Sequence, residues 1–259
     1  MRSKSVLFTL MVRFNNKKRN TMENYSTTTR VIDQSVVSAL FKSTYLQMAA
    51  ALAVTALTAY FLPQSGLFER LFIKADGTIT MAPMWVAIIA ELGVVMWLSA
   101  RLFAMSMAKA TLLFILYSVL NGVTMSMIFL LYEPMSIAIT FAVTAGMFLV
   151  TSLVGYVTRM DMSKFGSIFM MLLVGLIIAT LVNMFLGSET MYWVITYVGV
   201  IVFVGLTAFD TNKLKQIYLQ HGEAGEMGQK LALMGALTLY LDFINLFLFL
   251  LRIFGDRRS

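Results

Sequence analysis

Seven long apolar stretches divide the chain, and short polar or turn-forming segments separate them. A helix that crosses a bilayer needs about 20 mostly apolar residues. The stretches cover residues 44–62, 83–100, 111–131, 136–157, 165–186, 191–209 and 231–251. The pattern therefore predicts an all-α integral membrane protein, a bundle of seven transmembrane helices, with one membrane domain over residues 30–255.

Composition supports this class and excludes several others. Of the 259 residues, 59% are hydrophobic and 13% are charged, whereas about a quarter of a soluble domain is charged. The chain has no cysteine and one histidine, His221. These counts exclude disulfide frameworks, thiolate metal sites and haem attachment. Neither an HExxH nor a GxSG motif occurs, so we expect no enzymatic activity and no cofactor.

The distribution of lysine and arginine predicts the orientation. The N-terminal segment and the loops near 101–110, 158–164 and 211–230 together hold fifteen of the twenty basic residues. Cytoplasmic loops are enriched in these residues, so the N-terminus is expected in the cytoplasm. The net charge of +7 then reflects topology and gives no reason to expect nucleic acid as a partner.

The two ends of the chain leave questions open. Residues 1–29 are basic and contain no stretch long enough to span a bilayer, so they are either a cytoplasmic tail or an upstream extension before a true start at Met22. With seven spans the C-terminus faces the opposite side, although residues 256–259 form a basic tail. A re-entrant last segment would return this tail to the cytoplasm; a full span is the favoured prediction.

The last apolar stretch carries a polar stripe. Gly235, Thr238, Asp242, Asn245 and Arg252 recur at helical spacing among leucines and phenylalanines. An ionised carboxylate at the centre of a bilayer costs about 2.5–3.5 kcal/mol on insertion scales, and such residues usually face the bundle interior or a water-filled cavity. Asp242 is therefore the first candidate for a functional residue.

Depth estimates from helical rise suggest two polar layers. Asp242, Glu91 and Asn121 come out near the midplane of the bilayer. Asp210 and Arg101 come out near the cytoplasmic end, where a carboxylate–guanidinium pair is reasonable. Glu91 is either a functional acid or a structural one bonded to Asn121 or to a backbone carbonyl.

The segments FDTNKLKQI and LTLYLDFINLFLFLLRIFG, with NGVTMSMIF in the third span, resemble the Bax inhibitor-1 family, also called the transmembrane Bax inhibitor motif proteins, in its bacterial branch. The resemblance covers roughly residues 30–255. It implies a bundle whose last helix is central, a location in the bacterial inner (plasma) membrane, and a pH-sensitive leak of Ca²⁺. It also implies that Asp210 and Asp242 share a proton and are candidate Ca²⁺ ligands. The same resemblance implies that Arg101 engages the latch that this aspartate pair forms between the helices.

The chemistry of such a pair is simple. Two carboxyl groups within hydrogen-bonding distance cannot both ionise easily, so one proton is shared between them. Losing that proton creates repulsion and favours another arrangement of the helices. The estimated depths of Asp210 and Asp242 differ by roughly 14 Å, so pairing requires the sixth helix to continue through TNKLKQIYL.

A second function from another class is also open. The protein could regulate a membrane-protein partner, such as a protease or a component of a stress response, through direct contacts. The aspartates would then serve only the specificity of the fold.

Overall fold

The computed structural model describes residues 34–73, 78, 80–158, 160 and 162–258. The basic segment 1–29 and the alternative start at Met22 lie outside the described residues. All long elements within the described ranges are helices. Their bounds are α2 (Gln34–Phe61), α3 (Leu67–Phe72), α4 (Ala82–Arg101), α5 (Met107–Met125), α6 (Ile128–Leu131), α7 (Pro134–Val157), α8 (Gly166–Leu186), α9 (Glu189–His221) and α10 (Glu226–Phe254).

Seven helical segments of the described chain are long and apolar enough to cross a membrane, which confirms the predicted class. Short 3₁₀ turns extend three elements: Leu62–Gln64 follows α2, Leu102–Ala104 follows α4, and Met162–Phe165 precedes α8. The third span consists of α5 and the short α6 together.

The sixth helix is longer than the apolar pattern alone indicated. The predicted span ended at residue 209, whereas α9 continues to His221. The chain between these points contains no proline or glycine, and the helix ends where Gly222 donates its backbone N–H to the Tyr218 carbonyl. Hydropathy marks where a helix leaves the apolar layer, not where the helix ends. The extension that pairing of the two aspartates required is therefore present.

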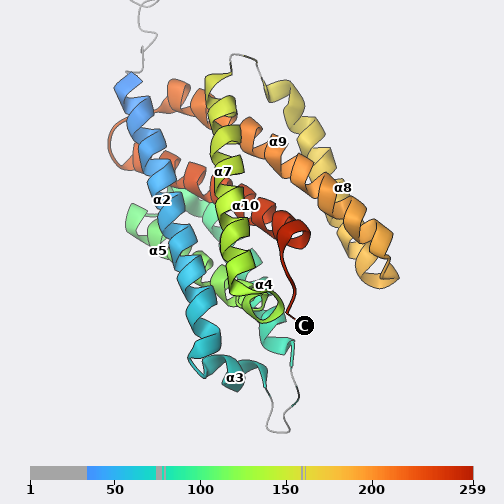
Figure 1. The fold of residues 1–259 in the computed structure, drawn as a ribbon. Coiled ribbons are helices and arrows are strands. Elements are labelled where there is room, and N and C mark those ends of the chain that lie inside the picture. Colours follow the sequence, from blue (N-terminus) through green and yellow to red (C-terminus); the bar gives the residue numbers. More distant parts are fainter. Residues whose placement is uncertain (1–33, 74–77, 79, 159, 161, 259) are drawn as a thin grey trace, which may run out of the picture.

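The last helix is the centre of the bundle. In its apolar stretch 72% of the residues are buried, compared with 6% in α8. Figure 1 shows α10 crossing behind α2 and α7, and it packs against α9, α2, α7 and α5. Close packing is possible because small residues face the neighbours: a Cβ at Gly235 would overlap the Tyr218 hydroxyl of α9. The helix is continuous over 29 residues without a reversal, and it is one of the seven helices long and apolar enough to cross a membrane.

The C-terminal residues after α10 run back along the end of α6 and the start of α7. The Glu133 N–H donates to the Asp256 carbonyl at 2.9 Å, and the Arg258 N–H donates to the Leu131 carbonyl at 3.0 Å. The Arg258 guanidinium also lies 3.4 Å from the Glu133 carboxylate. These contacts give the basic C-terminal residues partners at the end of the bundle opposite the start of α2.

Candidate functional site

Asp210 on α9 and Asp242 on α10 meet in the interior of the bundle. Their carboxyl groups lie within hydrogen-bonding contact of each other. Asp242 is 5% exposed, and its buried Oδ2 has no hydrogen-bond partner among the described residues. A hydrogen bond between two carboxyl groups requires that one of them carries a proton. The geometry therefore brings two carboxyl groups from different helices into contact.

The pair lies in the wall of a cavity of about 620 Å³ between α8, α9 and α10. The predicted polar stripe of α10 faces this cavity through Thr238, Asp242, Asn245 and Arg252. Gly235 does not, because it lies against α2 and α9. The α8 wall is mostly apolar. The polar stripe thus faces the space between α8, α9 and α10, as expected for charged groups on an apolar helix.

Two cations lie at opposite ends of this cavity. Lys213 follows Asp210 by three residues on α9, so it lies beside that carboxyl group, and both line the cavity. Arg252 lies ten residues after Asp242 on α10, and its guanidinium stacks on the rings of Tyr192 and Phe249 at 5.2 and 5.1 Å. The carboxyl pair is therefore an acidic centre between two basic ends.

Neutral oxygens supplement the carboxyl groups. The Thr238 hydroxyl donates to the Met234 carbonyl at 3.0 Å, which leaves its oxygen as an acceptor. The Asn245 amide nitrogen donates to the Leu241 carbonyl at 2.8 Å, which leaves Oδ1 as an acceptor. A hard cation such as Ca²⁺ takes six to eight oxygen ligands. The described residues contain no group of three or more acidic, histidine or cysteine side chains, so a cation here would keep part of its water.

The position of Asp210 depends on a close seam between α7 and α9. A Cβ at Gly155 would overlap the Ala208 carbonyl oxygen. The Asn212 amide donates to the Gly155 carbonyl at 3.1 Å, and the Ser152 and Thr211 hydroxyls are 2.9 Å apart. These bonds fix the turn of α9 that carries Asp210.

The predicted pair between Arg101 and Asp210 is not formed. Arg101 is the last residue of α4 and is exposed, and it lines a different cavity between α4 and α5. The two described ion pairs are Lys230–Glu226 and Arg258–Glu133. The depth estimate gave the correct end of the bundle for Arg101 but could not give its direction around the helix axis. The two-layer arrangement is wrong for a different reason: α9 continues to His221, and Asp210 lies beside Asp242 and not in a separate layer.

Glu91 and Asn121 form a separate cluster between α4 and α5. The Asn121 amide donates to one Glu91 carboxyl oxygen, and the Thr124 hydroxyl lies 3.3 Å from the other. The predicted Glu91–Asn121 bond is therefore present. Neither residue lines the cavity of the aspartate pair.

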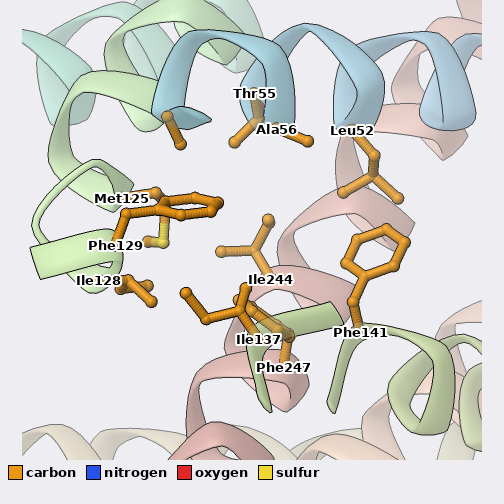
Figure 2. A pocket seen from close by; sticks show the side chains of 11 residues that line it. Leu52, Thr55, Ala56, Met125, Ile128, Phe129, Ile137, Phe141, Ile244 and Phe247 are labelled. Atoms are coloured by element: carbon orange, nitrogen blue, oxygen red, sulfur yellow. The ribbon is translucent and has the colours of Figure 1, made fainter. Parts of the chain in front are cut away.

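A smaller cavity of about 70 Å³ lies between α2, α5, α6, α7 and α10. Figure 2 shows the side chains that surround it, among them Leu52, Phe141 and Ile244. Its lining contains no charged residue. Thr55 supplies its one polar side chain.

Sequence reasoning did not single out two features of this site. The spacing of Lys213 is the signal that could have identified it, because a residue three positions after Asp210 on a helix lies beside it. The α8 wall has no comparable signal, since its apolar side chains resemble those of any lipid-facing helix.

Comparison with known proteins gives a consistent result. The family model described as "Inhibitor of apoptosis-promoting Bax1" matches residues 37–259. The chain is 49% identical over 216 residues to the inner membrane protein YbhL of Escherichia coli K12, covering 83% of this chain and 90% of that protein. It is 41% identical to the uncharacterized protein RP147 of Rickettsia prowazekii over 83% of this chain and 88% of that protein. A Deinococcus radiodurans protein is 39% identical over 88% of this chain and 94% of its own length.

Proposed function

Because this chain belongs to the Bax inhibitor-1 family, we propose that it is a pH-sensitive leak pathway for cations, including Ca²⁺, across a bacterial inner membrane. One observation carries the proposal. The carboxyl groups of Asp210 and Asp242 contact each other in the wall of the cavity between α8, α9 and α10, and each belongs to a different helix.

The gate follows from the charge of the pair. With one shared proton the two carboxyl groups attract each other and hold α9 against α10. With no proton both are negative, and in an apolar surrounding their repulsion favours separation of the helices. The pathway is thus closed in the shared-proton state and opens as the pH rises.

The ionised pair is also a suitable transient binding site for the cation along the pathway. Two carboxylates with the Thr238 and Asn245 oxygens attract a hard cation but do not surround it. A pathway requires this intermediate strength, because a site that binds too tightly does not release its ion. The paired acids serve as both sensor and attraction, and no resident metal is needed.

The same proposal places the start of α2 on the cytoplasmic side. Since the chain has no cysteine, single cysteines report on sidedness directly. Ser106, between α4 and α5, and Thr190, at the start of α9, are both exposed. In inside-out vesicles a membrane-impermeant maleimide should label Ser106→Cys and not Thr190→Cys. The reverse pattern would invert the orientation.

The function is tested by Ca²⁺ entry into liposomes that contain the purified protein. Wild-type flux above that of protein-free liposomes, with a pH response that is absent in Asp210→Asn/Asp242→Asn, supports the proposal. A folded wild-type protein that conducts no Ca²⁺ at any pH overturns it. In that case the family resemblance would point to regulation of a membrane-protein partner, and the aspartates would be structural.

A further inference from the structure

A cavity of about 400 Å³ lies between the end of α4 and the start of α5, apart from the aspartate site. Arg101 and Lys109 provide two positive charges to its lining. The remaining lining residues are apolar or aromatic: Trp97, Ala104, Met105, Leu112 and Leu113. No acidic residue contributes to this lining. The cavity therefore combines a cationic part with an apolar part.

Both cations are available to a ligand. Neither takes part in the two ion pairs of the described chain, which join Lys230 to Glu226 and Arg258 to Glu133. Glu226 is the carboxylate that contacts the α4–α5 connection, because it accepts the Met107 N–H at 3.3 Å. That same carboxylate oxygen is 3.1 Å from the Lys230 ammonium. Glu226 is therefore paired with Lys230 and not with Arg101 or Lys109.

The position of the cavity favours a lipid. Trp97 is 58% exposed and Leu112 is 66% exposed, on the outer surface of spanning helices that faces acyl chains. Tryptophan at the end of a span is typical of the membrane–water interface. Basic pockets between helices at this level bind the head groups of anionic lipids.

We propose that Arg101, Lys109 and Trp97 form a binding site for the phosphate head group of an anionic phospholipid, with one acyl chain along Leu112 and Leu113. The guanidinium and the ammonium contact the phosphate, and the tryptophan ring covers the glycerol region. The site lies at the end of the bundle where α2 begins. It is independent of cation flux, and it gives Arg101 a role that does not require contact with Asp210.

Native mass spectrometry of the detergent-purified full-length protein tests this assignment. The protein is incubated with phosphatidylglycerol or with phosphatidylcholine, which share a phosphate but differ in net charge. We expect wild type to retain phosphatidylglycerol preferentially. In Arg101→Gln/Lys109→Gln the preference should fall by about fivefold for each cation removed. The control is Lys42→Gln, which removes an exposed cation at the same end of the bundle, outside this cavity.

Three results would overturn the proposal. The first is equal retention of both lipids by wild type. The second is an unchanged preference in the double variant, shown to be folded by its unfolding temperature. The third is full displacement of phosphatidylglycerol by inorganic phosphate alone, which would make this a site for soluble anions. If the double variant does not fold, Lys109→Gln alone carries the test, with an expected loss of about fivefold.

Discussion

Gly155 of α7 packs directly against the backbone carbonyl of Ala208 of α9, two residues before Asp210. No side chain fits between these two helices at this level. The contact sets the distance of α9 from α7 and thereby the direction in which Asp210 points toward α10. A change at Gly155 should therefore affect both stability and the aspartate pair.

Gly155→Ala is expected to destabilise the protein by about 1–3 kcal/mol, because the added methyl group forces two packed backbones apart. Gly146→Ala is the matched control, since it lies on the same helix and a Cβ there meets no atom within 4 Å. Thermal unfolding in detergent measures both. Equal unfolding temperatures for the two variants would show that the α7–α9 seam is not tight.

Lys213→Gln should move the pH of half-maximal Ca²⁺ flux upward, on the order of one unit. The ammonium group lines the same cavity as the aspartate pair and attracts two carboxylates more strongly than one, so without it we expect the shared proton to be retained to higher pH. Lys42→Gln is the control, because Lys42 is an exposed cation on α2 that does not line the cavity. A downward shift in Lys213→Gln would contradict the gate.

Glu91 gives a test that separates structural acids from functional ones. Glu91→Ala leaves the buried Asn121 amide without its acceptor and should cost about 1–3 kcal/mol of stability. Glu91→Gln keeps an acceptor oxygen for the Asn121 amide and should reduce stability less than Glu91→Ala does. Both variants should keep the wild-type pH response of flux, since Glu91 does not line the cavity. Loss of that response in a folded Glu91→Gln protein would place Glu91 in the pathway.

Much of the fold could be predicted because the bilayer imposes a simple rule. Every span needs about 20 apolar residues, so the number and order of the helices follow from the hydropathy pattern. The direction of the polar stripe on α10 could likewise be predicted, because charged residues on an apolar helix face the interior of the bundle. Helix ends were less predictable, since α9 continues to His221 as a polar helix that hydropathy does not detect.

The pairing of side chains between helices was the harder part. Depth along the bundle follows from residue counting, but direction around each helix axis depends on which neighbours it packs against. Arg101 and Asp210 share an end of the bundle and yet line different cavities. Only the contacts of Gly155 with Ala208, and of α10 with its neighbours, place Asp210 beside Asp242.

The most direct test of the central claim compares single and double variants of the aspartate pair. Ca²⁺ flux into liposomes is recorded from mildly acidic to mildly alkaline pH for wild type, Asp210→Asn, Asp242→Asn and the double variant. An amide beside a carboxylate cannot develop the repulsion of two negative charges, so each variant should lose the rise in flux with pH that wild type shows. A single variant that is folded and keeps the wild-type pH profile would contradict the shared-proton gate.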